Sequence, residues 1–356
     1  MIDEDTEVES VYDREDQTED ELWFLPGEPE DRAPTDLPWP LANRAALFEA
    51  QTWQRAEGRQ GRGLADAASA FARLDERLRG FESGVSHGLA ERLVLLEVAD
   101  LLWAQGDRIP MERIALYRHA RESTLANAQV LSSADWALRR MAAHLQPTGG
   151  LYAFLGRQKV EEDGLAEIST RAVGAGFEGA EADWVGVLEQ MRNAHPITQA
   201  AAAYHAWRIF GLSAPADVLE AAVAAGKIGA KGAKALGFLP VAMGDRYALG
   251  QGGTPAELLS SWYKGVENAC LRGLMQLDQL EYWRARAVRE TADLSGKTPP
   301  LLIEAFVQSP LVSAEMAATI TGVSKAAVQR NLSKFAHRGL IREITGQGRY
   351  QFWMVA

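Results

Sequence analysis

The C-terminal stretch "SAEMAATITGVSKAAVQRNLSKFAHRGLIREITGQGRYQFWMVA", residues 313–356, decides the class of this fold. Ser313 and Ser324 each precede a run of helix-forming residues, and a serine in that position accepts hydrogen bonds from the free N–H groups of a first helical turn. Gly322 stands between the two runs and can adopt the left-handed conformation of a tight turn. Two short helices joined in this way predict a helix-turn-helix motif. The apolar face of the first helix is predicted to consist of Met316, Ala317 and Ile320.

The second predicted helix has one buried and one exposed face. Val328, Leu332 and Phe335 recur at i, i+4 and i+7, which is the spacing of a core-facing stripe. The N-terminal turn of such a helix usually points at base edges in DNA. The residues that we predict to contact DNA lie in this turn, opposite the stripe and on its flanks: Ser324, Lys325, Gln329, Arg330, Ser333 and Lys334.

The residues after this helix predict a wing. "RGLIREITGQGRYQFWMV", residues 338–355, has the pattern of a turn, a short strand, a Gly-bearing turn and a second strand. Such a wing would carry Arg342 and Arg349 close to the backbone of bound DNA. In an extended strand Tyr350 and Phe352 share one face and Trp353 takes the other. We therefore predict a winged helix-turn-helix domain with a two-stranded wing over residues 297–356, and double-stranded DNA as its partner.

Charge is distributed unevenly along the chain, whose formal net charge is −11. Residues 297–356 hold seven Lys and Arg against three Glu, which favours contact with nucleic acid. Residues 1–36 hold fifteen Asp and Glu against two Arg. Their like charges and few apolar residues predict a disordered acidic arm. The arm has two open interpretations, a solubilising tail or an autoinhibitory competitor of DNA phosphate at the basic domain.

The middle of the chain has helical periodicity. In residues 65–81, Phe71, Leu74, Leu78 and Phe81 recur at helical spacing. The same logic predicts helices within residues 88–106 and 182–194, and two helices within 196–226 that are broken at Gly211–Pro215. We predict a mainly α fold, in which a helical bundle of roughly eight to ten helices spans residues 37–250.

Residues 254–294 predict one long helix. Thr254, Pro255 and Glu257 form the pattern of a capping box with proline at the first helical position. An apolar stripe follows at near-heptad spacing, made of Leu259, Trp262, Val266, Cys270, Leu277 and Leu280. This stripe has two interpretations, a core helix of the bundle or a dimerisation helix that packs against a second copy.

Three lysines in "AAGKIGAKGAKALGF", residues 224–238, form a further candidate site. Lys227, Lys231 and Lys234 fall at i, i+4 and i+7, so they would share one face of a helix. The face is either solvated or a second phosphate-contacting surface, because lysine binds phosphate as a point charge.

No pattern of catalytic or metal-binding residues stands out. The six histidines are scattered, and the lone Cys270 cannot build a cysteine-rich metal site. Gly84–Gly88 matches G-x-S-x-G, but it follows a charged helical run, whereas a nucleophile elbow follows an apolar strand. We predict no enzyme activity, no cofactor and no metal. An N-terminus rich in acids, a single cysteine and the lack of about 20 consecutive apolar residues predict a cytoplasmic protein without a membrane segment.

Two patches carry a family resemblance. Residues 310–353 resemble the C-terminal winged helix of a rhizobial, often plasmid-encoded family of uncharacterised proteins, and "AFARLDERLRGF" at 70–81 is similar to the first helical block of that family. The resemblance implies a helical domain of unknown function followed by a DNA-binding helix-turn-helix. The same patches also resemble parts of Fic-type AMP-transferases. The His, Phe, acid and Gly-Asn motif of those enzymes is missing from "NAHPITQAAAAYHAW", so the resemblance is architectural only.

Together these observations predict a sequence-specific DNA-binding regulator of transcription or of a plasmid-associated process. The helical domain would supply dimerisation, and would sense an unknown small ligand or protein partner. Two alternatives stay open: an adaptor that uses its winged helix to bind protein, and an enzyme hidden in the helical domain.

Overall fold

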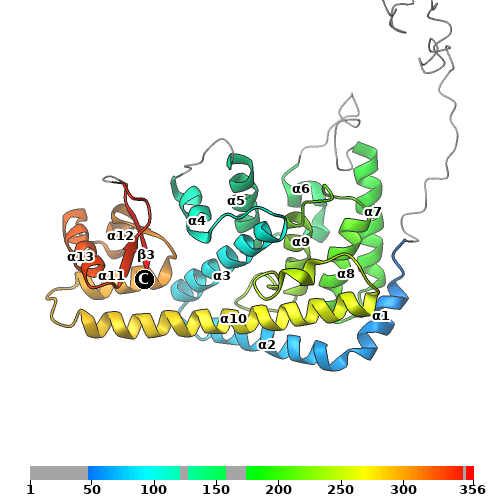
Figure 1. Cartoon of the computed structure of the whole chain (residues 1–356), viewed down its shortest axis with the longest axis horizontal. Helices are drawn as coiled ribbons and strands as arrows, with labels where there is room; N and C mark the ends of the chain where they lie inside the picture. The colour runs from blue at the N-terminus through cyan, green and yellow to red at the C-terminus, as the bar shows by residue number, and fades with distance from the viewer. Residues whose placement is uncertain (1–46, 121–126, 158–173, 348–349) are drawn as a thin grey trace, which may run out of the picture. The chain divides into compact units, whose positions relative to one another are not determined.

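The computed structural model describes residues 47–120, 127–157, 174–347 and 350–356. The predicted acidic arm lies outside the described residues. The fold is mainly α, as predicted, because the described residues contain thirteen α-helices and one small antiparallel sheet near the C-terminus. Figure 1 shows the long helix α10 running alongside α2 and reaching the C-terminal elements. No helix in the described ranges is long and apolar enough to cross a membrane.

Nine α-helices precede α10 in the described part of the chain, within the predicted range of eight to ten. They are α1 Ala50–Arg59, α2 Gly61–Arg79, α3 Ser83–Ala104, α4 Met111–Ala120, α5 Ala128–Ala142, α6 Leu151–Leu155, α7 Gly174–Gln190, α8 Pro196–Ile209 and α9 Leu219–Gly229. The predicted break between α8 and α9 is confirmed. Because α2 ends at Arg79, Phe81 lies beyond the helix to which its spacing assigned it. Gly84–Gly88 lies in the first turns of α3, with no strand before it.

The centre of the helical domain is filled by small and aromatic side chains. Most residues of α8 and α9 are buried, because these helices are rich in alanine and largely apolar. The indole rings of Trp184 and Trp207 meet edge to face, with centroids 5.3 Å apart. The indole N–H of Trp184 donates to the carbonyl of Ala203 at 2.9 Å, so its polar atom is satisfied inside the core.

A largely non-helical strap, residues 230–244, follows α9 and is held by two buried carboxylates. Asp75 of α2 accepts hydrogen bonds from the backbone N–H groups of residues 234–236 at 2.8–2.9 Å. Glu97 of α3 accepts from those of residues 241–243 at 2.8–3.0 Å. Buried N–H groups outside regular structure need such partners, so the two carboxylates fix the path of the strap.

Helix α10, Pro255–Glu290, begins with the predicted capping box. The N–H of Thr254 donates to Oε2 of Glu257 at 2.8 Å, and Oγ1 of Thr254 accepts from the N–H of Glu257 at 3.4 Å. All six residues of the predicted stripe are buried within the chain. The core-helix interpretation is therefore right, and this stripe is not free to bind a second copy.

The C-terminal domain contains three helices and three short strands: α11 Thr298–Gln308, β1 Val312–Ser313, α12 Ala314–Thr321, α13 Lys325–His337, β2 Ile341–Glu343 and β3 Phe352–Val355. The strand order is β1-β3-β2, and both pairings are antiparallel. β2 and β3 are the predicted wing. β1 was not predicted, because two residues are too short to show an alternating pattern.

The C-terminal domain is fixed to α3 and α10. A Cβ atom at Gly88 of α3 would lie 1.9 Å from the carbonyl oxygen of Gln308, so only glycine permits this close approach of α11. Arg92 of α3 donates to the carbonyls of Phe306 and Ser309, the latter at 2.7 Å. The contact with α10 includes the indole of Trp283, which donates to the carbonyl of Leu340 at 2.7 Å.

Candidate nucleic-acid interface

The serine caps and the glycine turn predicted for α12 and α13 are present. Oγ of Ser313 accepts the N–H of Met316 at 3.1 Å, and Oγ of Ser324 accepts that of Ala327 at 3.4 Å. Gly322 has a φ of 63°, the left-handed conformation that its position required. Local residues therefore determine where α12 ends and where α13 begins.

The two helices differ in how well their faces were predicted. Val328, Leu332 and Phe335 of α13 are buried, as expected. In α12 the prediction was wrong for Ile320, whose residue surface is 43% exposed. The core-facing side of α12 runs through Ala314 and Ala317. Ile320 lies instead on the side of α12 that, together with Met316, lines a surface cavity.

All six residues predicted to contact DNA from α13 and its cap are exposed: Ser324, Lys325, Gln329, Arg330, Ser333 and Lys334. Among the described residues, Lys325, Arg330 and Lys334 form no ion pair. The hydroxyl of Ser333 donates to the carbonyl of Gln329 at 3.1 Å, so its proton is used within the helix. Three unpaired cations on one exposed helix are suited to an anionic partner.

Arg338 of the C-terminal domain, in contrast, is already paired. Nη1 and Nη2 of Arg338 lie 2.6 and 2.8 Å from the two carboxylate oxygens of Asp293. The hydrogen bonds from Arg338 lower the pKa of Asp293 to about 2. Arg338 therefore connects the end of α13 to the segment after α10, whereas the three cations named above stay available.

The wing differs from its prediction in two respects. Tyr350 is not in β3, since its φ is 57° and its surface is 82% exposed, so it does not share a strand face with Phe352. Phe352 and Trp353 are both buried, because each face of β3 is covered. Arg342, predicted to face DNA, lies 2.5 Å from Oε1 of Glu112 in α4. Arg349 lies outside the described residues.

A family model described as an HTH DNA binding domain matches residues 299–356. The C-terminal domain is a helix-turn-helix domain. The match extends from α11 to the end of the wing and includes the turn at Gly322, and it indicates DNA binding by these residues. No curated protein matches the chain.

A cavity of about 780 Å³ opens beside the exposed side of the helix-turn-helix domain. Its walls come from α12, the first half of α13, the start of β3 and the end of α4. Lys325 and Gln329 of α13 line it together with His119 of α4. Sequence reasoning missed Glu112 and His119, because nothing local connects α4 with the wing.

The prediction of a second phosphate-contacting surface is wrong for Lys227. Lys227 is buried, and its Nζ donates to the carbonyls of Ala143 and Gly237 at 2.5 and 2.8 Å and of Met141 at 3.3 Å. Burial lowers the pKa of Lys227 to about 8. Helix α9 ends at Gly229, so the exposed Lys231 and Lys234 lie in the strap rather than on a shared helix face.

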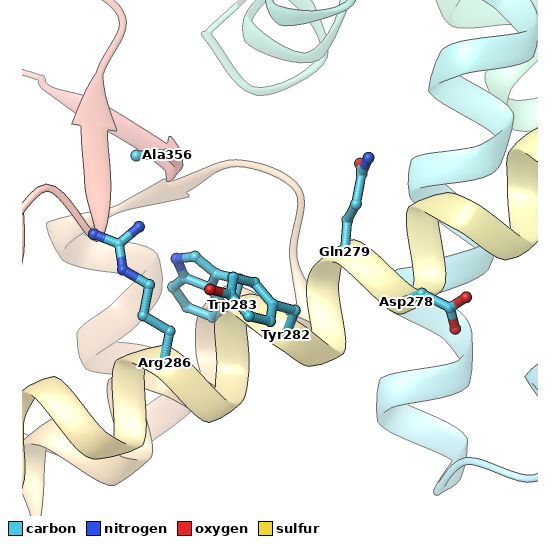
Figure 2. Close-up of a pocket in the computed structure, with 6 residues that line it drawn as sticks. All are labelled: Asp278, Gln279, Tyr282, Trp283, Arg286 and Ala356. Carbon is cyan, nitrogen blue, oxygen red and sulfur yellow. The ribbon is translucent and has the colours of Figure 1, made fainter.

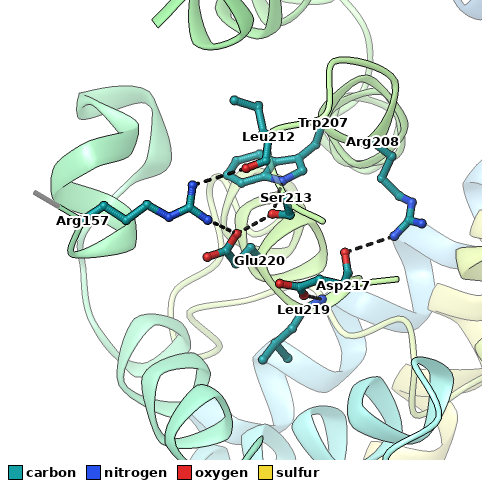
Figure 3. Close-up of polar contacts among 8 residues, drawn as sticks. All are labelled: Arg157, Trp207, Arg208, Leu212, Ser213, Asp217, Leu219 and Glu220. Carbon is teal, nitrogen blue, oxygen red and sulfur yellow. Dashed lines mark hydrogen bonds and ion pairs between the residues drawn. The ribbon is translucent and has the colours of Figure 1, made fainter. Parts of the chain in front are cut away.

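A polar cluster of the helical domain joins the segment after α6 to α8 and α9 (Figure 3). Arg157 forms an ion pair with Glu220 at 2.5 Å, and Ser213 donates to the same carboxylate. The indole N–H of Trp207 donates to Oγ of Ser213 at 2.8 Å. The serine hydroxyl contacts a carboxylate and an indole but no histidine in this cluster, so the cluster fixes the α8–α9 connection rather than presenting an activated nucleophile.

A second cavity, of about 470 Å³, lies between α10 and the C-terminal residue (Figure 2). Tyr282, Trp283 and Arg286 line it from one side of the helix, and Ala356 lies opposite. Trp283 is occupied by its bond to Leu340, and Arg286 forms an ion pair with Glu290 at 2.8 Å. The cavity thus lies where α10 meets the helix-turn-helix domain. The indole N–H of Trp283 and the guanidinium of Arg286 are already bonded to protein groups.

The histidines do not form a metal site in the described residues, where no group of three or more His, Cys, Asp or Glu could hold an ion. His205 is buried next to Trp53, Tyr204 and Trp262, and its Nε2 has no partner among the described residues. Burial lowers the pKa of His205 to about 3, so it is neutral at physiological pH. His205 is therefore an uncharged aromatic residue of the core.

Proposed function

We propose that this protein is a sequence-specific DNA-binding regulator that reads its target through α13. The observation that carries the proposal is the exposed face of α13, where Lys325, Arg330 and Lys334 have no ionic partner among the described residues. Lysine and arginine neutralise phosphates, and arginine and glutamine form bidentate contacts with guanine and adenine edges. Gln329 and Arg330 are therefore the base readers, and Lys325 and Lys334 contact phosphate.

The regulated process is transcription or plasmid maintenance, and the resemblance to plasmid-encoded proteins supports the second. The single, buried Cys270 is consistent with work in the reducing cytoplasm. A homodimer on a two-fold site belongs to this proposal, but it must use a surface other than the buried stripe of α10. No enzyme activity is assigned, since no described cluster joins a nucleophile, a base and an oxyanion site.

The test is recovery of bound DNA from sheared genomic fragments, followed by footprinting of the enriched site. We expect one enriched sequence, and we expect the triple variant Lys325→Ala/Arg330→Ala/Lys334→Ala to lose it. The matched control removes three exposed arginines of the helical domain, Arg62→Ala/Arg79→Ala/Arg192→Ala, and should keep the same footprint. Equal loss in both triple variants would mean that net charge, not α13, carries binding.

The adaptor alternative is favoured by one observation, the exposed Ile320 and Tyr350 beside the 780 Å³ cavity. Exposed apolar groups near a cavity are typical of protein contacts. A protein that binds no DNA fragment at low salt, yet is captured through Ile320 by a partner, would support the adaptor instead.

A further inference from the structure

The wing of the helix-turn-helix domain contacts α4 of the helical domain at two points. Nη2 of Arg342 in β2 lies 2.5 Å from Oε1 of Glu112. The imidazole of His119, two turns further along α4, lies against the ring of Phe352 in β3, with centroids 6.2 Å apart. Two side-chain contacts therefore join α4 to the small sheet that carries the wing.

Arg342 is the only Lys or Arg among the described wing residues, 341–347 and 350–355. Its guanidinium has a planar fork that binds carboxylate and phosphate in the same bidentate manner. The side chains of Arg342 and Glu112 are 52% and 32% exposed, so the pair is open to solvent and to a competing anion. A DNA phosphate and the Glu112 carboxylate are thus alternative partners for one cation.

The other end of α4 lies close to the base-reading residues. His119 lines the 780 Å³ cavity together with Lys325 and Gln329 of α13. A volume of this size is in the range of small-molecule sites and far below that of a duplex. Since α4 lines this cavity through His119 and contacts the wing through Glu112, DNA that contacts the first turn of α13 and the wing at once would lie close to α4. The carboxylate of Glu112 would repel its phosphates.

We propose that α4 is an intramolecular brake on DNA binding, in which Glu112 occupies Arg342 until a DNA phosphate replaces it. The inference rests on the proposed function, since it assumes that the helix-turn-helix domain binds duplex DNA. It adds that the helical domain weakens this binding. A ligand or partner that displaces α4 from the wing would then release the brake.

The expected effect of the brake on DNA affinity is small. Partly exposed ion pairs contribute at most about 1 kcal/mol, which corresponds to about fivefold in a binding constant. The contact is electrostatic, so its effect on binding must fade as the Debye length falls from about 10 Å at 0.1 M salt to about 3 Å at 1 M.

The experiment is a double-mutant cycle on binding of the full chain to a random-sequence duplex at 0.1 M salt. The four proteins are the wild type, Glu112→Gln, Arg342→Ala and the double variant, each checked for an unchanged melting temperature. We expect Glu112→Gln to tighten binding about two- to fivefold when Arg342 is present and to have no effect when it is absent. The control Glu315→Gln removes a charge from the neighbouring α12 and should act equally in both backgrounds.

Two results overturn the inference alone: unchanged affinity in Glu112→Gln, or an equal gain with and without Arg342, which would make Glu112 only a distant charge. If the wild type binds no duplex even at low salt, the proposed function itself fails and the brake fails with it. The two failures are therefore distinguished by the wild-type measurement.

Discussion

The helical domain and α13 use their charged side chains in opposite ways. In the helical domain Asp75, Glu97 and Lys227 point inward and bind backbone groups of the strap and of neighbouring helix ends. On α13 the cations Lys325, Arg330 and Lys334 are exposed and form no ion pair among the described residues. Lysines at helical spacing therefore do not by themselves predict phosphate binding. What separates Lys227 from Lys334 is the composition of the surrounding helix, since α9 is largely apolar and α13 is apolar on one side.

The comparison is tested most strongly by Lys227→Ala. Its loss leaves the carbonyls of Met141, Ala143 and Gly237 without their buried donor, which should lower the free energy of unfolding by about 3 kcal/mol. Thermal and urea unfolding give the value. Lys231→Ala, the control in the exposed strap, should change it by less than about 0.5 kcal/mol. If Lys227→Ala kept full stability but lost DNA affinity, the structural role given to Lys227 would be wrong.

The second test uses the pH dependence of Glu97. Burial raises the pKa of Glu97 from 4.5 to about 7, because the ionised form is disfavoured in the core. The native state then holds this proton more tightly than the unfolded chain. The contribution of Glu97 to the free energy of unfolding should therefore fall by about 3 kcal/mol as pH rises from about 4.5 to about 7.

Glu97→Gln isolates this contribution, since an amide does not titrate. The wild type should exceed the variant in stability most clearly at pH 5, and the gap should narrow toward pH 8, as measured by urea unfolding across the pH series. A gap that is constant with pH would show that Glu97 does not change its protonation in this range.

The third test concerns the exposed cations of α13. Arg330→Ala should weaken binding to the selected DNA site by about 2 kcal/mol and relax the base preference at one position. The melting temperature should stay the same, because Arg330 is exposed and forms no ion pair among the described residues. Competition binding with single-base variants of the site measures both effects. Unchanged preference would mean that another face of α13 meets the bases.

The smallest expected effect belongs to Lys334→Ala. This side chain is exposed near the end of α13 and is assigned to phosphate, so its loss should weaken all sequences alike. The slope of log K against log salt should fall by about one. A salt titration of fluorescence anisotropy gives the slope. An unaltered slope would show that Lys334 does not contact phosphate.

Local chemistry made part of this structure predictable. The capping box at Thr254, the serine caps and the left-handed Gly322 depend on residues within four positions, so their sequence patterns were sufficient. The buried stripe of α13 followed from its period for the same reason. The helical bundle followed from repeated spacing, although the exact end of α2 did not.

Tertiary contacts made the rest unpredictable. Glu112 and Arg342 lie 230 positions apart, and no pattern in the sequence couples them. Lys227 had the spacing of a surface stripe, but the end of α5 and the strap enclose it. Ile320 had the spacing of an apolar face, but the core packs against Ala314 and Ala317, and Ile320 lines the cavity instead. The contacts of Lys325, Gln329, Arg330 and Lys334 with DNA stay a prediction of the sequence that their exposure supports.

The continuity of α10 determines how the molecule rotates in solution. Its 36 residues form an uninterrupted helix of about 54 Å, which packs on α2 at one end and on the helix-turn-helix domain at the other. The part of the chain that contains α2, α10 and α13 should therefore tumble as one body, with a shared correlation time for amides in α2 and in α13. A flexible tether would instead let the small domain relax several times faster. DNA bound at one end would then slow the rotation of the entire body.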